Sequence, residues 1–312
     1  MSHDKKLDPA ARAAWLSYVA GRTQDEIAQE MGVSRQTAQR LVAQALAAGI
    51  VRVRIDHPLA RCLDLAARMR DRFGLQFCEV VPAEGGLAGV GMAVAALIER
   101  ALSRPEPMTL AIGTGRTLHA AVGQMPPIDC PQHRIVSLTG NIAPDGSTAY
   151  YNVLFSLSVL VTARSYPLTV PVIATTREEC EALQRQPGNA RVIEMARDAD
   201  LALVGIGSLG ADAPLLKDGF MQSAEMAALV AAGGVGEIIG RAYDSDGRFL
   251  PADGRVASAS LPQRAGALIV GASFGPGKFA AIRGAIRGGM ISGLITDVET
   301  ADWLLANGGP SH

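Results

Sequence analysis

The stretch MTLAIGTGRTLHAAVGQM, residues 108–125, joins an apolar run, a Gly-rich turn and a helix-like pattern in immediate succession. From about residue 78 onward, short apolar runs of the same kind alternate with turns and helical patterns. The other runs are FCEVVPA, HRIVSLTGN, LTVPVIAT, ADLALVGIGSLG, VGEIIGRAYD and ALIVGASF. Alternating strand and helix signals of this length are typical of a mostly parallel sheet covered by helices. We therefore predict a doubly wound α/β domain over residues 78–312.

The turn in IGTGRTL is a candidate ligand site, because ligands of doubly wound sheets bind at the carboxyl ends of the strands. Gly113 and Gly115 permit a tight turn, and a helix that begins directly after it offers free N–H groups to an anion. Thr114, Arg116 and Thr117 add two hydroxyls and a positive charge. A Gly turn selected only for strand–helix packing is the alternative, but packing alone does not require Thr, Arg and Thr together.

Two further Gly-rich loops are similar to nucleotide-binding motifs but depart from them. GIGSLG at 205–210 matches G-x-G-x-x-G, yet ADAPLLKDG follows in place of an immediate helix, so a small-ligand loop is favoured over a dinucleotide site. In GASFGPGKF, five residues rather than four separate Gly271 from Gly277, and Phe279 stands where a P-loop needs Ser or Thr. This spacing argues against an NTPase. Lys278 begins a helix-like segment, where we expect it to meet an anion; an exposed lysine is the alternative.

The chain offers few groups for catalysis or metal binding. Its five histidines are isolated, and no Ser–His–Asp order, metal-ligand spacing or paired carboxylates stand out. The four cysteines are scattered along the chain, which is usual for proteins of a reducing cytoplasm. We see no apolar leader and no uninterrupted membrane-spanning run. We therefore expect a cytoplasmic protein that is not an enzyme and has no metal, no cofactor and no membrane partner.

The first 56 residues have a different pattern, with three short helical segments. Asp8 and Pro9 are suited to begin the first helix, as its cap and its first residue. Thr23 and Glu26 have the spacing of a capping box, which begins a second helix. Ser34 is expected to cap a third helix, RQTAQRLVAQALAA. The three- and four-residue spacing of buried faces places these apolar residues on the inner face of that helix: Ala38, Leu41, Val42 and Leu46. Two helices joined by a short turn that contains Gly are typical of a helix-turn-helix.

The N-terminal turns of that third helix carry basic and polar side chains, and this part of a recognition helix enters the major groove of DNA. Arg can bind guanine and Gln can bind adenine, whereas hydroxyls suit phosphates or bases. The segment IVRVRID (50–56) then alternates like a basic wing. The candidate DNA contacts are Arg22, Thr23, Ser34, Arg35, Gln36, Thr37, Gln39, Arg40, Arg52 and Arg54. A hairpin whose polar face meets only water is the alternative, but the capping box, Gly turn and basic wing together favour DNA binding.

Composition adds weaker constraints. With 48% hydrophobic and 19% charged residues, the chain can bury a substantial core. The formal net charge of −1 gives no whole-chain sign of nucleic-acid affinity, although residues 1–56 hold eight Lys or Arg against six acids. Residues 57–77, HPLARCLDLAARMRDRFGLQF, are predicted to form a helix that links the N-terminal part to the α/β domain.

Nearly end to end, the chain resembles the SorC-type, or DeoR/CggR-like, sugar-binding transcriptional regulators of bacteria. The resemblance rests on TQDEIAQEMGVSRQTAQRLVAQALAAGIVRVRI, IGTGRTL, ADLALVGIG, VGEIIGRAYDSDGR and GKFAAIRGAIRGGMISGLITDVETADWLL. It implies a winged-helix or homeodomain-like reader of operator DNA over 1–56. It also implies an effector-binding and oligomerisation domain over 78–312, related to the sugar isomerase and glucosamine-phosphate deaminase fold. The expected homo-oligomer is a tetramer or dimer of dimers.

The resemblance further implies a ligand, which is a sugar, polyol or sugar phosphate that alters operator binding. Its implied contacts are Gly113, Thr114, Gly115, Arg116, Thr117, Gly140, Asn141, Asp244 and Lys278. The loop after IVSL reads Thr139-Gly140-Asn141 rather than a Gly pair, and GASFGPGK differs from the shorter Gly-rich form expected before the lysine. Both departures leave room for an unphosphorylated polyol.

These observations together predict a transcriptional regulator of a carbohydrate or polyol catabolic operon. The alternative is a sugar-phosphate isomerase or deaminase on the same fold, with the N-terminal helices serving as an oligomerisation module. A convincing acid/base pair near GTGRTL would favour that enzyme, and the sequence does not show one.

Overall fold

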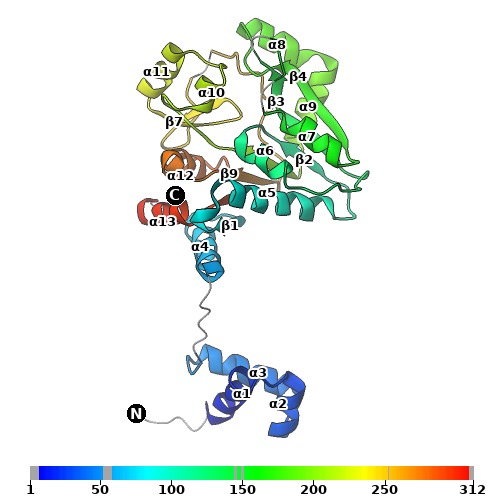
Figure 1. Ribbon diagram of the computed structural model, residues 1–312, viewed down its shortest axis with the longest axis vertical. Coiled ribbons are helices and arrows are strands. Elements are labelled where there is room, and N and C mark those ends of the chain that lie inside the picture. Colours follow the sequence, from blue (N-terminus) through cyan, green and yellow to red (C-terminus); the bar gives the residue numbers. More distant parts are fainter. Residues whose placement is uncertain (1–6, 52–57, 144–145, 149–150, 252, 309–312) are drawn as a thin grey trace. The chain divides into compact units, whose positions relative to one another are not determined.

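The computed structural model describes residues 7–51, 58–143, 146–148, 151–251 and 253–308. The chain divides into two compact units, Met1–His57 and Pro58–His312, and Figure 1 labels many of their elements. The first unit is helical, and the second is built on a parallel sheet. The predicted fold class is therefore confirmed.

The first unit contains helices α1 (Asp8–Tyr18), α2 (Gln24–Met31) and α3 (Arg35–Ala47). Small residues at the helix contacts allow the three backbones to approach closely. The core consists of Ala13, Leu16, Ile27, Ala28, Ala38 and Val42. A second cluster joins the N-terminal half of α1 to the end of α3 through Ala10, Ala14 and Ala45.

Two expectations for this unit were wrong in detail. Leu7 occupies the N-cap position of α1, and Asp8 is the first residue of the helix, so Asp8 is not the cap. Its negative charge in the first turn still interacts favourably with the positive end of the helix dipole. Leu46 was expected on the buried face of α3 but is 41% exposed. The buried face instead continues from Ala38 through Val42 to Ala45, which is the spacing of one helical stripe.

The second unit is organised around a seven-stranded sheet of order β1-β10-β9-β5-β2-β3-β4, in which all paired strands are parallel. The strands are β1 (Phe77–Val81), β2 (Thr109–Ile112), β3 (Arg134–Ile142), β4 (Arg164–Pro171), β5 (Leu201–Gly205), β9 (Leu268–Ala272) and β10 (Gly293–Asp297). From β2 the chain proceeds to β3 and β4 on one side, and from β5 to β9 and β10 on the other. This reversal of direction between β2 and β5 is the topological switch point at which such sheets bind ligands.

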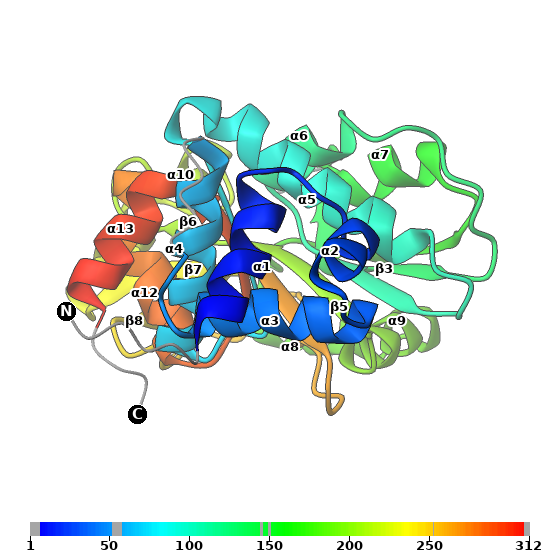
Figure 2. The same ribbon diagram turned by 90° about the horizontal axis from the view of Figure 1, so that it is seen from below.

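Both faces of the sheet are buried, as a parallel sheet requires. Leu201 and Leu203 of β5 belong to one core, whereas Ala202 and Val204 belong to the other. Helices α5 (Gly86–Leu102), α6 (Arg116–Val122) and α7 (Val153–Leu160) cover the first face. The other face is covered by α4 (Pro58–Phe73), α9 (Pro187–Arg197), α12 (Phe279–Arg287) and α13 (Val298–Asn307), while α8 (Arg177–Arg185) packs on α9. The two layers can be followed in Figure 2.

A smaller antiparallel sheet replaces one of the expected parallel strands. VGEIIGRAYD folds into strands β7 (Gly234–Ile238) and β8 (Arg241–Asp244), and β6 (Gly207–Ser208) pairs with β7. The prediction failed here because a two-residue connection can form only a hairpin, whereas parallel strands need a long crossover. Helices α10 (Pro214–Lys217) and α11 (Ser223–Ala231) lie near this sheet, drawn in yellow-green in Figure 1.

Helix α4 coincides with the predicted linking helix but is part of the second unit. It packs against β1 and α13, and it buries Cys62, Leu65, Met69 and Phe73 in the core. These apolar residues recur at three- and four-residue intervals, so one face of the helix is committed to the sheet.

Among the described residues, one helix is long and apolar enough to cross a membrane by length and composition. It is α5 together with the turn before it, Ala83–Leu102. Val90, Val94, Ile98 and Leu102 of this helix are completely buried in the core that it shares with α6. A helix that is apolar on most sides is expected in the centre of a large unit, and we interpret α5 in this way.

Candidate functional sites

The helix-turn-helix begins with the predicted capping box. The N–H of Thr23 donates to Oε2 of Glu26 at 2.7 Å, and the N–H of Glu26 donates to Oγ1 of Thr23 at 3.3 Å. The first of these hydrogen bonds holds the pKa of Glu26 below its ordinary value. Gly32 ends α2 with a φ of 67°, and Ser34 caps α3 by accepting from the N–H of Thr37 at 3.2 Å. Both predicted caps are confirmed.

The N-terminal turns of α3 present the side chains that the sequence suggested for DNA contact. Ser34, Arg35, Gln36, Gln39 and Arg40 are exposed, and Thr37 is half-buried. Arg22 and Thr23 are exposed at the start of α2. The other two candidates, Arg52 and Arg54, lie outside the described residues.

Two acids accompany this basic surface. Arg35 lies 3.5 Å from Asp25, and Arg22 lies 3.7 Å from Glu26. All four side chains are about half or more exposed, so these ion pairs contribute little to stability. Asp25 nevertheless places a negative charge beside Arg35 on this surface.

The second unit contains a cavity of about 280 Å³ at the switch point of the sheet. Its wall is formed by the loops after β2, β5 and β9, together with the small antiparallel sheet and the α10 region. The polar lining side chains are Thr114, Arg116, Thr117, Thr139, Tyr151, Asp218, Glu237, Ser273 and Lys278. The apolar part includes Leu87, Leu118, Ile206, Leu215, Phe220, Ile239 and Phe274. A cavity with an apolar wall and a few convergent polar groups is typical of a small-molecule site.

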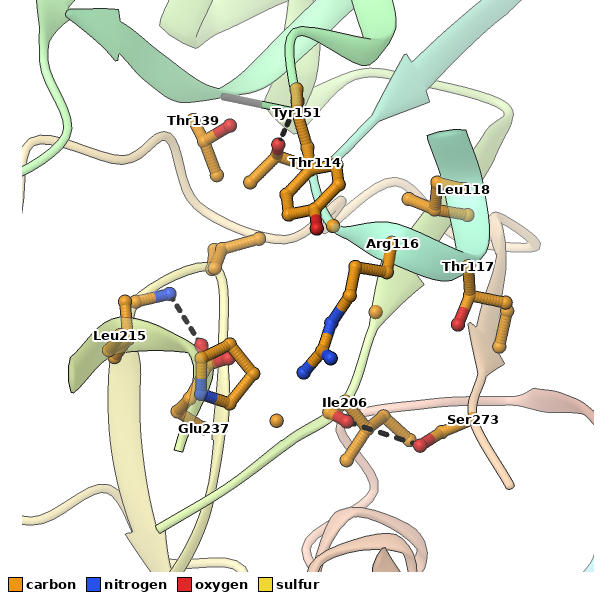
Figure 3. A pocket seen from close by; sticks show the side chains of 18 of the residues that line it. Thr114, Arg116, Thr117, Leu118, Thr139, Tyr151, Ile206, Leu215, Glu237 and Ser273 are labelled. Atoms are coloured by element: carbon orange, nitrogen blue, oxygen red, sulfur yellow. Dashed lines mark hydrogen bonds between the residues drawn. The ribbon is translucent and has the colours of Figure 1, made fainter. Parts of the chain in front are cut away.

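The loop Gly113–Thr117, which the sequence suggested for ligand contact, lines the cavity. Arg116 is the first residue of α6 and extends into the cavity, as Figure 3 shows. Its guanidinium makes no hydrogen bond or ion pair with the described residues, so its donors remain available to a ligand. Thr114 donates its hydroxyl to the backbone carbonyl of Tyr151, which ties the β2 loop to the segment before α7.

Lys278 also reaches the cavity, at the end of the 3₁₀ turn Pro276–Lys278. Burial lowers the pKa of Lys278, the nearby carboxylate of Glu237 raises it, and the positive charge of Arg116 lowers it further. Burial raises the pKa of Glu237, partly opposed by the hydrogen bond from Gly240 and by Lys278. The cavity therefore combines two cations with a carboxylate in a poorly solvated space, where hydrogen bonds to a ligand are strengthened.

The backbone of the small sheet places Glu237 in this position. Gly207 pairs with Glu237 across β6 and β7, and a Cβ at residue 207 would lie 2.7 Å from Cδ of Glu237. Oε2 of Glu237 accepts from the N–H of Gly240 at 2.9 Å. Between them, Ile239 has a φ of 49°, an outlier for a β-branched residue, and its buried side chain lines the cavity. Strain of this kind is concentrated at functional sites.

Three other predicted contacts lie elsewhere. Gly140 and Asn141 line a second, smaller cavity. Gly140 is required by packing, because a Cβ there would lie 2.5 Å from the carbonyl oxygen of Val170. Asp244 does not line either cavity; its carboxylate accepts from the N–H groups of Asp246 and Arg248, both at 2.9 Å, and so closes the turn after β8. We therefore remove Asp244 from the proposed ligand contacts.

Sequence reasoning missed several residues of the large cavity, above all Tyr151, Asp218, Glu237 and Ser273. Glu237 is the one charged residue in the apolar run VGEIIG. A charge inside a predicted strand was the signal that could have identified it as a site residue. Ser273 follows β9 in the loop Gly271–Lys278, which the edge rule for parallel sheets includes, but only Lys278 of that loop was named as a contact. Nothing local distinguishes Tyr151 or Asp218 from ordinary loop residues.

A helix-turn-helix unit joined to an α/β unit with a small-molecule cavity defines a class of protein, the ligand-binding transcriptional regulators. The family described as "Putative sugar-binding domain" matches residues 57–306, and the MarR family, whose members contain a helix-turn-helix, matches residues 13–60. The chain belongs to the SorC-type family of sugar-binding transcriptional regulators.

Individual relatives agree with this assignment over nearly the whole chain. The erythritol catabolism regulatory protein EryD of Brucella abortus is 36% identical, over 95% of this chain and 96% of its own. The transcriptional regulator LsrR of Klebsiella pneumoniae is 30% identical, over 95% and 92% respectively. The crystal structure of the full-length sorbitol operon regulator SorC from Klebsiella pneumoniae has a TM-score of 0.72 at 25% identity, covering 97% of this chain and 100% of that chain.

Proposed function

We propose that this protein regulates transcription of a carbohydrate or polyol catabolic operon, and that a sugar, polyol or sugar phosphate modulates its binding to operator DNA. The observation that carries the proposal is the cavity at the switch point, where Arg116, Glu237 and Lys278 converge within one chain that also holds an exposed helix-turn-helix. An effector site and a DNA reader are the two parts that such a regulator needs.

Residues 1–56 form the proposed DNA-binding domain, and residues 58–312 form the effector domain. The exposed Arg and Gln side chains at the start of α3 would contact base edges in the major groove, with Arg35 and Arg40 suited to guanine. Arg22, Arg52 and Arg54 would contact phosphates. Such contacts release counterions, so affinity should fall as the salt concentration rises.

The lining of the cavity suits a small, hydroxyl-rich ligand. Arg116 and Lys278 can donate to hydroxyl or phosphate oxygens, whereas Glu237 and Asp218 can accept from hydroxyls. The names of two relatives refer to erythritol and sorbitol, both of which are polyols. A polyol is therefore the first ligand to test, followed by sugars and their phosphates.

The proposed mechanism is a population shift. The ligand binds two arrangements of a homo-oligomer, a tetramer or dimer of dimers, with different affinity, and the arrangements differ in the spacing of their recognition helices. The protein would act in the cytoplasm, where the DNA and the metabolite are both present. It would need no catalytic group, metal or cofactor.

The test begins with selection of DNA sequences by the full-length protein, followed by fluorescence-anisotropy titration of the selected DNA. Erythritol, sorbitol, hexoses and their phosphates are then added. We expect specific DNA binding and a change of at least tenfold in DNA affinity with one ligand class. Steady turnover of a sugar phosphate without specific DNA binding would instead support the isomerase or deaminase alternative.

A further inference from the structure

A second, much smaller cavity lies beside the proposed effector cavity. Its volume is about 10 Å³, which is the space needed by one water molecule or one hydroxyl group. Four residues, Gly113, Thr114, Thr139 and Tyr151, line both cavities. A ligand in the large cavity therefore lies against the wall of the small one.

Two residues that line the small cavity each carry a buried polar atom without a partner among the described residues. Oδ1 of Asn141 and Nδ2 of Asn152 are both buried, and neither makes a hydrogen bond with a described residue. Asn141 lies near the end of β3, and Asn152 precedes the first residue of α7 without capping that helix through its side chain. Unpaired polar atoms in a poorly solvated space are unfavourable, so a pair of them in one small cavity points to an occupant.

The two atoms also define the chemistry of that occupant. Oδ1 of Asn141 can only accept a hydrogen bond, whereas Nδ2 of Asn152 can only donate one. A hydroxyl group satisfies both, because its hydrogen is donated to Asn141 while its oxygen accepts from Asn152. A phosphate is too large for about 10 Å³, and its ionised oxygens would face the acceptor of Asn141.

We propose that Asn141 and Asn152 form a hydroxyl subsite that binds one unphosphorylated alcohol end of the ligand in the large cavity. This inference rests on the proposed function and sharpens it. Arg116 and Lys278 can tolerate a phosphate on the other end of the ligand, whereas the asparagine subsite rejects one on its own end. The ligand is therefore either an unphosphorylated polyol, or a sugar or sugar alcohol that carries a phosphate at one end only.

The test uses a matched pair of variants, N141D and N152D, in the full-length protein. Each adds one negative charge at the same cavity, but N141D keeps the acceptor whereas N152D replaces the donor by a second acceptor. An alcohol has one hydrogen to donate and cannot satisfy two acceptors, while a water molecule can. Asp is as good a residue before a helix as Asn, so N152D is compatible with the fold.

Calorimetric titration measures binding of erythritol, sorbitol, sorbitol 6-phosphate and a hexitol 1,6-bisphosphate. We expect N152D to weaken binding of the best polyol about tenfold and N141D to weaken it much less. We also expect the wild-type protein to bind the bisphosphate at least tenfold more weakly than the monophosphate. Urea unfolding of each variant checks that the fold is retained.

Three results would overturn the subsite. Equal polyol affinity in wild type and N152D means that the small cavity holds only water. Stronger loss in N141D than in N152D contradicts the assignment of donor and acceptor, and tight binding of the bisphosphate contradicts the selection of a free alcohol. The proposed function survives all three, since it fails only if the wild-type protein binds no sugar or polyol or shows no response in DNA binding.

Discussion

The carboxylate of Glu237 occupies the space that a side chain at residue 207 would need. A Cβ on Gly207 would lie 2.7 Å from Cδ of Glu237 and 2.8 Å from its Cγ. We expect G207A to displace Glu237 from the cavity and to weaken polyol binding by roughly tenfold, the loss of about one charged hydrogen bond. Calorimetric titration of the variant measures this loss.

G188A is the matched control for that substitution. Gly188 lies at the start of α9, and a Cβ there would meet nothing within 4 Å. The exchange should leave ligand affinity unchanged and slightly increase the free energy of unfolding, because Ala is the better helix former. Equal ligand affinity in G207A and wild type would exclude Glu237 from the binding site.

Glu237 should also leave a signature in the pH dependence of stability. Its pKa in the folded protein lies above the ordinary value of 4.5, mainly because of burial. Between 4.5 and the raised pKa, the unfolded chain has lost this proton while the folded protein retains it, so the free energy of unfolding falls as pH rises through that window. E237Q should remove this fall, and its stability relative to wild type should increase from pH 4 to pH 7.

Urea unfolding at pH 4, 5, 6 and 7 measures the difference. The exposed Glu84 provides the control variant E84Q, for which we expect no such trend. If the difference in the free energy of unfolding between E237Q and wild type stayed constant from pH 4 to pH 7, burial would not disfavour the charged form of Glu237.

Lys278 should discriminate between neutral and anionic ligands. We expect K278M to weaken binding of a sugar phosphate by roughly 10- to 100-fold, because a charge-assisted hydrogen bond is lost, and to weaken binding of a neutral polyol by less. The control is K217M, which removes an exposed lysine paired with Asp212 at 2.8 Å. If both ligands lost affinity equally in K278M, the lysine would contribute packing rather than charge.

We expect the ion pair between Arg35 and Asp25 to oppose the proposed binding of DNA. We expect D25N to increase DNA affinity by roughly two- to fivefold at low salt, since it removes a negative charge near the phosphates and frees Arg35. Anisotropy titrations between 50 and 300 mM salt should show the gain shrinking as salt rises. D64N, which disrupts the exposed pair with Arg68 in the other unit, should change nothing; a decrease in D25N would contradict the proposed approach of DNA.

The capping box contributes to the stability of the helix-turn-helix. T23A removes the hydroxyl that accepts from the N–H of Glu26, and we expect it to lower the free energy of unfolding of this unit by about 1 kcal/mol. DNA affinity should fall in parallel, whereas polyol affinity should not. T23S restores the hydroxyl and should restore both stability and DNA binding, which circular-dichroism melting and anisotropy can measure.

The sequence predicted best what is determined locally. Thr23, Glu26 and Ser34 form their caps because the partners are three residues apart, and the loop Gly113–Thr117 joins the cavity because strand and helix follow directly in the chain. Gly140 and Asn141 were named from the family resemblance, and the structure adds that they line a separate, smaller cavity.

The sequence predicted poorly what depends on distant segments. Glu237 lines the cavity because β7 pairs with β6 in the small sheet rather than joining the main sheet. The letters VGEIIG alone do not indicate this pairing. Asp244 has the residue type of a ligand contact, but hydrogen bonds to its own turn satisfy it. Tyr151 lines the cavity, and its backbone carbonyl accepts a hydrogen bond from the hydroxyl of Thr114, which lies far from it in the sequence.

The order of the strands has a consequence for how the chain is made. Phe77 of β1 pairs with Gly293 of β10, and among the described strands β1 has no other neighbour in the sheet. Strand β1 is synthesised first and can pair only after β10, the last strand, has been made. The helix-turn-helix can fold at once, because its contacts are local. During synthesis the backbone N–H and C=O groups on the edge of β1 that pairs with β10 therefore stay unpaired until β10 is made. Truncation after residue 292 should accordingly yield a chain that aggregates rather than a smaller effector domain.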